Sequence, residues 1–242
     1  MIAGAPALSL LGAGVHIAAI TGRWMRIGHG PYLGMYEIVS TYALFAVLAL
    51  ILVVLKVRGT RPIAVVVMPL VFLMTAGAML PSKEAIPITG TLASWWLVIH
   101  VAFAKMATGS LIVAFAHGSV YLLRQREDAR RFFVRMPRQE VLDDLAFRFA
   151  SVGFIFLGIM IAAGAIWANE SWGRYWSWDP IETWSLVTWL GYAGVLHARL
   201  TLGWRGGRFA WAMVLALPFA LFAFLGVPLL YDSIHAFYVQ GL

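Results

Sequence analysis

Two groups of side chains in this chain could carry chemistry: its histidines and a segment rich in tryptophan. The six histidines are His16, His29, His100, His117, His197 and His235. Residues 167–184 read WANESWGRYWSWDPIETW, and six of the eleven tryptophans lie between 167 and 189. Neutral imidazoles ligate metal ions and haem iron, and indoles provide large, rigid contact areas. This combination indicates a site for a large, planar, hydrophobic ligand.

The composition is typical of a membrane protein. Of the 242 residues, 62% are hydrophobic and 12% are charged, whereas a soluble domain is about half apolar and about a quarter charged. These proportions exclude a soluble enzyme and a disordered regulator. The chain contains no cysteine, which excludes disulfides, thiolate metal sites, iron–sulfur clusters and any CxxCH haem-attachment sequence of its own.

Apolar stretches long enough to cross a membrane recur along the whole chain, since a spanning helix needs about 20 mostly apolar residues. The predicted spans are 2–22, 36–56, 62–80, 95–123, 147–168, 183–202 and 208–230. The first lacks a basic leader and a clear cleavage site, so we expect a retained helix and not a signal peptide. The sequence therefore predicts an all-α polytopic membrane protein, a single domain over 1–242 built as a bundle of about seven transmembrane helices.

The basic residues predict the orientation of these spans. Thirteen of the 18 lysines and arginines fall in or beside three alternate connections, at 57–61, 124–148 and 199–208. Because cytoplasmic loops carry an excess of Lys and Arg, we expect the N-terminus in the cytoplasm, and the C-terminus and the tryptophan segment outside it. The formal charge of +7 is thus explained without nucleic-acid binding. The 124–148 connection is expected to be a solvated, basic, cytoplasmic loop.

The tryptophan segment is open to two interpretations. An aromatic belt at the membrane interface would explain its position, but a belt needs neither fixed spacing nor an embedded glycine and acid. The alternative is a shaped platform, in which glycine permits close approach of the backbone to a ligand. The candidate platform residues are Trp172, Gly173, Trp176, Trp178 and Asp179. The Asp179-Pro180 pair also predicts the N-cap and first position of the next helix.

Depth in the membrane sorts the histidines. His100 lies about five residues into the fourth predicted span from its outer end, and His235 follows the seventh, so both are level with the tryptophan segment. Two imidazoles facing across a flat ligand would be bis-histidine haem ligation. His197 and His117 lie deeper in the predicted spans, and a histidine at such depth is either functional or hydrogen-bonded within the bundle. The other two histidines are expected to be structural or to support the site.

The motif WGRYWSWDPIETW, at 172–184, resembles the WWD signature of the haem-handling proteins of cytochrome c biogenesis. The final Asp-Pro-x-Glu-Thr-Trp makes it similar to the CcsA/ResC branch (System II) more than to CcmC. TGRWMRIGHGPYLGMYE (21–37) and LDDLAFRFASVGF (142–154) also resemble this branch, so the likeness covers nearly the whole chain.

The resemblance implies a function. It implies that the chain carries haem b, bound without covalent attachment, outward through the membrane and presents it at the WWD segment. There two thioether bonds would join the haem to the CxxCH of apocytochrome c. The resemblance further implies a cytochrome c haem lyase that acts with a CcsB/ResB-type membrane protein. Haem, apocytochrome c, this partner and membrane lipid are the expected partners, and nucleic acid is not.

Roles for single residues are also implied by the resemblance. His100 and His235 would ligate the outer haem iron, and one of them must yield to the incoming CxxCH histidine. His197 would serve an inner haem site whose second ligand comes from the partner protein. The tryptophans of the platform would seat the macrocycle, and Asp179 would fix the loop.

Three positions depart from the family pattern. His117 is the first, and it could help to complete the inner haem site or form a hydrogen bond within the bundle. Ile181 stands where the branch usually has lysine, and we expect it to alter the electrostatics of the loop without abolishing the site. Lys105 stands where an apolar residue is expected. It would pair with a haem propionate, Glu37 or Glu182, or would extend to the membrane interface.

Three alternative functions remain open. The chain could be a haem carrier without synthase activity, a b-type haem electron-transfer subunit that oxidises quinol, or a membrane anchor with an aromatic belt. A synthase forms thioether bonds, and a carrier binds haem without forming them. An electron-transfer subunit is reduced by quinol, and an anchor carries no haem.

Overall fold

The computed structural model describes residues 5–80, 84–88 and 90–235, and this part of the chain forms helices and no strands. The long helices are α1 (Ala5–Ile27), α2 (Met35–Lys56), α3 (Ala64–Gly77), α4 (Trp95–Leu123), α6 (Gln139–Trp172), α7 (Pro180–Thr201) and α8 (Gly207–Leu221). The short elements are 3-10 turns at Arg61–Ile63 and Gly90–Ala93, α5 (Glu127–Arg130), a π-helical turn at Phe222–Gly226, and α9 (Val227–Leu230).

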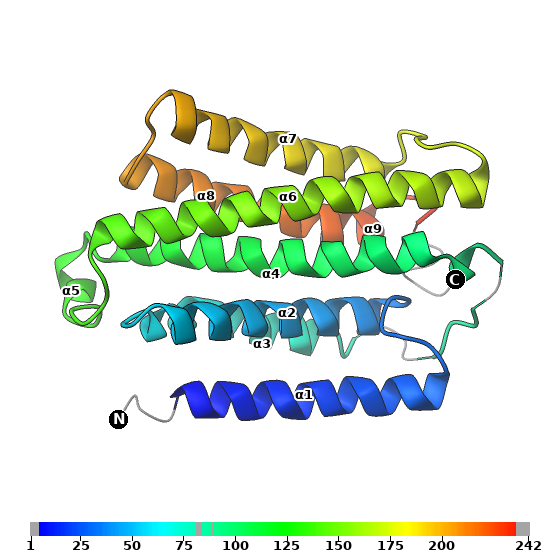
Figure 1. Ribbon diagram of the computed structural model, residues 1–242, viewed down its shortest axis with the longest axis horizontal. Coiled ribbons are helices and arrows are strands. Elements are labelled where there is room, and N and C mark those ends of the chain that lie inside the picture. Colours follow the sequence, from blue (N-terminus) through cyan, green and yellow to red (C-terminus); the bar gives the residue numbers. More distant parts are fainter. Residues whose placement is uncertain (1–4, 81–83, 89, 236–242) are drawn as a thin grey trace.

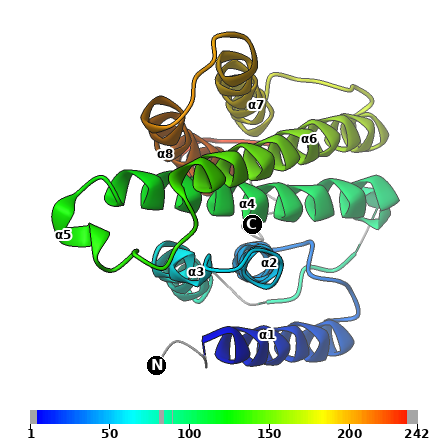
Figure 2. The ribbon, with the colours of Figure 1, turned by 60° about the vertical axis from the view of Figure 1, so that its left-hand side comes forward.

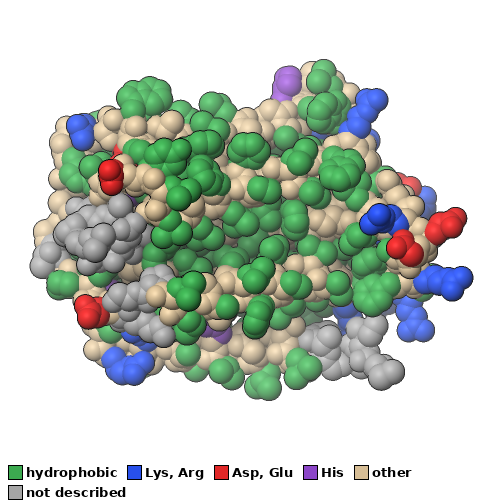
Figure 3. Space-filling model, turned by 180° about the vertical axis from the view of Figure 1, so that it is seen from behind, with side chains coloured by type: hydrophobic (Ala, Val, Ile, Leu, Met, Phe, Trp, Pro, Cys, Tyr) green, Lys and Arg blue, Asp and Glu red, His purple; other side chains and the backbone are tan. Residues whose placement is uncertain are grey.

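The long helices lie side by side and alternate in direction (Figure 1), and each predicted span overlaps one of them. Hydrophobic side chains cover the middle of the face shown in Figure 3, and charged side chains gather toward its ends. Within the part of the chain that the structure describes, the helical stretches long and apolar enough to cross a membrane are Met35–Lys56, Trp95–Leu123, Gln139–Trp172 and Gly207–Leu230. The predicted class, an all-α membrane protein, is confirmed.

The connections sort into two ends of the bundle. Those after α2, α4 and α7 lie together at one end with the start of α1, and those after α1 and α6 lie at the other, near the end of α9 (Figure 1). The basic connections therefore share one end, and the tryptophan segment lies at the opposite end. Which end faces the cytoplasm stays a prediction from the charge.

α6 extends beyond its predicted span of 147–168 at both ends, so the basic connection is shorter than the predicted 124–148. An apolar pattern misses the first turns of α6 because they carry polar residues. This stretch is nevertheless anchored to the protein interior, because Asp143 in the second turn is buried.

The last predicted span, 208–230, is interrupted by the π-helical turn at Phe222–Gly226. Pro228 follows directly in α9. Proline has no N–H to donate to the carbonyl four residues earlier, so regular α-helical bonding cannot continue through this turn.

α4 is the central helix and packs against α2, α6 and α8 (Figure 2). Glycines make these contacts close. A Cβ added to Gly109 would lie 2.7 Å from the carbonyl oxygen of Phe45 in α2, and one added to Gly118 would lie 3.0 Å from that of Ala210 in α8. Small residues at such contacts let helix backbones approach one another in a membrane.

Gly109→Ala is therefore expected to lower the free energy of unfolding by about 1–3 kcal/mol, because a backbone oxygen cannot move aside without shifting α2. Gly191→Ala in α7 is the matched control, since nothing lies within 4 Å of its added Cβ and alanine has the higher helix propensity. Denaturant unfolding of the purified variants in detergent measures both. Equal stability of the two variants would contradict the close contact between α2 and α4.

A buried ion pair joins α6, α7 and the connection to α8 near the basic end. Nη1 of Arg199 donates to Oδ2 of Asp143 at 2.5 Å, and these side chains are 3% and 8% exposed. Oδ1 of Asp143 accepts from the backbone N–H of Gly206 at 3.0 Å. The guanidinium also lies over the rings of Phe147 and Phe209. Both charges are thus satisfied within the bundle, as buried charges require.

Candidate functional site

His100 lies in the second turn of α4, whose start is set by the N-cap Ser94. Nδ1 of His100 is 2.8 Å from the carbonyl oxygen of Met160 in α6. A carbonyl only accepts hydrogen bonds, so Nδ1 carries the proton and Nε2 keeps its lone pair. His100 therefore presents a nitrogen that is ready to ligate a metal.

The His100 ring packs directly against the backbone of Gly164 in α6. A Cβ at this position would lie 2.6 Å from Nδ1 of His100 and 2.9 Å from its Cε1. Only glycine leaves room for the ring at this point. Sequence reasoning did not identify Gly164, because nothing local distinguishes it from other glycines in an apolar span.

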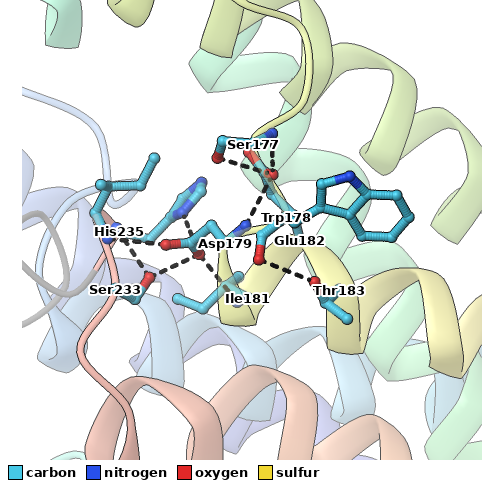
Figure 4. A network of polar contacts seen from close by, with 9 residues as sticks. Ser177, Trp178, Asp179, Ile181, Glu182, Thr183, Ser233 and His235 are labelled. Atoms are coloured by element: carbon cyan, nitrogen blue, oxygen red, sulfur yellow. Dashed lines mark hydrogen bonds and ion pairs between the residues drawn. The ribbon is translucent and has the colours of Figure 1, made fainter.

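His235 follows α9 and is brought to the same region by Asp179 (Figure 4). Nδ1 of His235 donates to Oδ1 of Asp179 at 3.0 Å. Asp179 also accepts from the hydroxyl of Ser233 at 2.8 Å and from the backbone N–H of Ile234 at 2.9 Å. The carboxylate can only accept from this ring, so Nδ1 carries the proton and Nε2 of His235 is again the nitrogen that keeps its lone pair.

Asp179 has the predicted helix-capping role as well. It is the N-cap of α7, accepts from Ile181 N–H at 3.0 Å, and forms a capping box with Glu182. Burial opposes its ionised form, but hydrogen bonds from His235 and Ser233 outweigh burial and lower the pKa of Asp179 to about 2. The carboxyl is therefore ionised at neutral pH, and one side chain both begins α7 and anchors His235.

Both imidazoles line one cavity of about 760 Å³, part of which is open to the outside. The rest of its lining is mostly apolar and aromatic and comes from the connection after α1, from α2, α4, α6 and α7, and from the π-helical turn and α9. The two histidines also border an adjoining cavity of about 350 Å³. Among the described residues, no group of three or more metal-ligating side chains is gathered as for a bare metal ion. The site therefore offers two imidazole nitrogens and a large apolar space.

Trp167 lies against both imidazoles, although sequence reasoning did not select it as a site residue. Its ring centroid is 6.5 Å from that of His100 and 5.8 Å from that of His235. It is 2% exposed, and its Nε1 donates to the carbonyl of Thr91 at 3.0 Å. Trp172 meets the rings of Trp167 and His235 edge-on at 5.0 and 5.3 Å.

The other two platform tryptophans are placed differently. Trp176 lines the smaller cavity beside the imidazoles. Trp178 is 70% exposed, and its indole points away from His235 (Figure 4). Its φ of 60° is in the left-handed region, which is costly for a bulky side chain and often marks a functional site. Thr183 helps to hold it there, since its hydroxyl donates to the Trp178 carbonyl at 3.2 Å.

Gly173 ends α6 as its C-cap, with a φ of 72° and its N–H bonded to the carbonyl of Asn169. Nothing lies within 4 Å of a Cβ added at this position. The need for glycine is therefore conformational, whether or not a ligand also approaches the backbone.

Gly173→Ala is expected to lower the free energy of unfolding by about 1–2 kcal/mol, because alanine strains in the left-handed region. Gly173→Asn should lose less, since asparagine tolerates this conformation. Chemical unfolding in detergent measures both. Haem titration of the same variants separates the two roles. Unchanged haem affinity indicates a purely conformational role, and a large loss would instead support close approach of the ligand.

The deeper histidines are not joined to each other. His117 is fully buried, donates from Nδ1 to the carbonyl of Val113 at 2.7 Å and stacks on Phe149. His197 is exposed on α7, 3.4 Å from the hydroxyl of Thr201. No hydrogen bond or ring contact links the two among the residues described. Nε2 of His117 has no hydrogen-bond partner there.

The structure also defines the contacts of Ile181 and Lys105, the other two residues that depart from the expected pattern. Ile181 lines both cavities. Lys105 is 6% exposed, and its Nζ donates to the backbone carbonyl of Pro31 at 2.5 Å. Its hydrogen bond thus goes to neither of the expected carboxylates. Glu37 pairs with Arg23.

The fold and the cavity define the class of this protein: a helical membrane protein with a histidine-flanked site beneath a tryptophan-rich loop. The family described as "Cytochrome C assembly protein" matches residues 32–235. The cytochrome c biogenesis protein CcsA of Parasynechococcus marenigrum is 34% identical over 247 residues, covering 89% of this chain and 80% of that protein. The CcsA of Synechococcus elongatus is 33% identical over 287 residues, covering 97% and 88%. This chain belongs to the cytochrome c assembly protein family as a CcsA-type member, and the family expected from the tryptophan motif is confirmed.

Proposed function

We propose that this chain is the haem-binding membrane subunit of a cytochrome c synthase. In this role it moves haem b outward and presents it for attachment to the CxxCH of apocytochrome c. The coarser role, in cytochrome c assembly, follows from family membership. Haem is the cargo and substrate of the proposed reaction.

One observation carries the proposal. His100 and His235 come from distant parts of the chain, border the same cavity, and each has Nδ1 engaged by an acceptor. Ligating histidines characteristically donate their other ring N–H in this way, which fixes the tautomer and aims Nε2 at the metal. Two such nitrogens are the ligand set of a bis-histidine haem.

The lining of the cavity that both imidazoles border suits haem. This apolar and aromatic lining, with Trp167 against both imidazoles, is what a hydrophobic macrocycle requires. Trp172 and Trp176 would seat the macrocycle, and the exposed Trp178 would face the incoming peptide.

The chemistry needs little from the chain beyond positioning. A thioether forms when a cysteine S–H adds across a haem vinyl group: sulfur bonds one carbon, the proton goes to the other, and nothing leaves. This chain has no cysteine, so both thiols come from apocytochrome c. Its contribution is proximity, a fixed haem edge beside an extended peptide, with Gly173 and Asp179 shaping the loop that holds it.

The inner part of the route is proposed from His197. This side chain is exposed on α7, where a second ligand from a CcsB/ResB-type partner could meet it. His117 is fully buried and stacked on Phe149. A role for it in an inner haem site would require that packing to open. The N-terminus would lie in the cytoplasm, and the C-terminus and WWD segment outside.

The experiment is co-expression of the chain with a CcsB/ResB-type protein and an apocytochrome c in a host lacking its own system. The purified complex should show a six-coordinate haem spectrum, and the cytochrome should keep its haem after denaturation. An apocytochrome with serines in place of both cysteines is the control and should keep none.

Other results would favour other functions. Haem bound without covalent cytochrome would support a carrier, and haem reduction by quinol alone would support electron transfer. A purified protein without haem absorbance would support an anchor. Each of these results would overturn the synthase proposal.

A further inference from the structure

The two imidazoles of the site are held by different acceptors. Nδ1 of His235 donates to the Asp179 carboxylate at 3.0 Å. Nδ1 of His100 donates to the neutral backbone carbonyl of Met160 at 2.8 Å. A hydrogen bond to an ionised acceptor is roughly twice as strong as one between neutral groups, and a carboxylate raises the basicity of a ligating histidine. His235 would therefore be the stronger donor to the iron of a bound haem.

His235 is also held more firmly in place than His100. Asp179 also binds the backbone N–H of Ile234 and the hydroxyl of Ser233, so the segment before His235 is tied to the start of α7. Displacing His235 would take a donor from a buried carboxylate.

His100 is held less firmly. Within the described residues it has one hydrogen bond to α6, and its ring occupies the space left by the missing side chain of Gly164. Rotation of the His100 side chain breaks only a bond between neutral groups.

We propose that the two histidines of the site have different roles. His235 is the iron ligand that is retained, and His100 is the ligand that is replaced by the histidine of the incoming CxxCH segment. Asp179 is the positioning residue for His235, and Gly164 is the positioning residue for His100. This inference rests on the proposed function, since it needs haem between the two imidazoles.

The exchange is balanced without any other reactant. The bond between iron and Nε2 of His100 breaks, and a bond to the incoming imidazole forms. His100 keeps its proton on Nδ1, so no proton is released and no electron is transferred.

Carbon monoxide is a suitable probe, because it binds ferrous haem by replacing the weaker axial ligand and leaves the stronger one opposite to it. The full chain is loaded with haem, reduced and titrated with carbon monoxide. Two variants are compared with the unsubstituted chain. Gly164→Ala pushes the His100 ring from its seat while raising helix propensity. Asp179→Asn removes the charge but keeps a good N-cap and an acceptor for His235.

The two variants should have opposite effects. Gly164→Ala is expected to raise carbon monoxide affinity about tenfold or more, because His100 no longer competes for the iron. Loss of a group that supports a metal ligand typically weakens that ligand by this factor. This variant should leave the C–O stretching frequency unchanged, because His100 has left the iron. Asp179→Asn should leave the affinity nearly unchanged and shift that frequency, because His235 stays opposite to the bound molecule. Gly191→Ala, which meets open space, should change neither.

The reverse pattern would overturn the proposal, and so would equal effects of the two variants or a haem that carbon monoxide cannot reach. In all these cases haem is bound, so the proposed function stands. An unsubstituted chain that binds no haem would remove the proposed function itself.

Discussion

Alanine in place of His100 or His235 is expected to lower haem affinity by more than about 100-fold. Removing a group that only hydrogen-bonds a metal ligand lowers metal affinity by up to about 100-fold, and removing the ligand itself should lower it further. Each substitution takes one of the two nitrogens that we propose as haem ligands from the cavity they share. The remaining haem should be five-coordinate, since one imidazole is left. Optical titration of haem into the purified variants measures both the dissociation constant and the coordination state.

His16→Ala is the matched control for these variants. Nε2 of His16 is 2.8 Å from the hydroxyl of Ser40, and His16 is not among the residues that line the cavity. This variant should bind haem as the unsubstituted chain does. Six-coordinate haem of unchanged affinity in either the His100 or the His235 variant would show that the ligands lie elsewhere.

Asp143→Ala is expected to lower the free energy of unfolding by about 3–5 kcal/mol, because it leaves the Arg199 guanidinium buried without its counter-charge. Arg199 is 3% exposed, so water cannot replace the lost carboxylate. The backbone N–H of Gly206 also loses its acceptor. Unfolding of the purified variant in detergent measures the loss.

The double variant Asp143→Leu with Arg199→Met separates the charge effect from packing. Replacing both partners of a buried pair by apolar residues of similar volume is often nearly neutral. The double variant should therefore be more stable than Asp143→Ala alone. If it were less stable than that single variant, the pair would contribute much more than the cost of an unpaired charge.

The fold was predictable where a property is local. The fourth predicted span, 95–123, coincides with α4, because an apolar run, its length and its capping residue are written in one stretch of sequence. Asp179 was predicted as an N-cap for the same reason, and α7 begins directly after it. The extent of α6 was not predictable in this way, since its first turns depend on Arg199, a partner from another helix.

The candidate site shows the same division. The histidines and the tryptophan segment stand out by residue type, and their depth in predicted spans places His100 and His235 near one end of the bundle. Trp167 and Gly164 were missed as site residues. Trp167 matters because it meets both imidazoles, and Gly164 because a Cβ there would strike His100. Both properties arise only when distant helices pack.

By itself, the sequence determines that this protein is a helical membrane protein, that its basic connections alternate, and that it belongs to the cytochrome c assembly protein family, because composition, periodicity and a dense motif are properties of the chain. Only the tertiary structure decides that two imidazoles border one cavity, that each holds its proton on Nδ1, and that one is bound to a carboxylate and the other to a backbone carbonyl. The reason is physical. The acceptors of the two imidazoles, the space beside Gly164 and the shared cavity are all formed by atoms from separate helices, and helix packing sets the distances between these atoms.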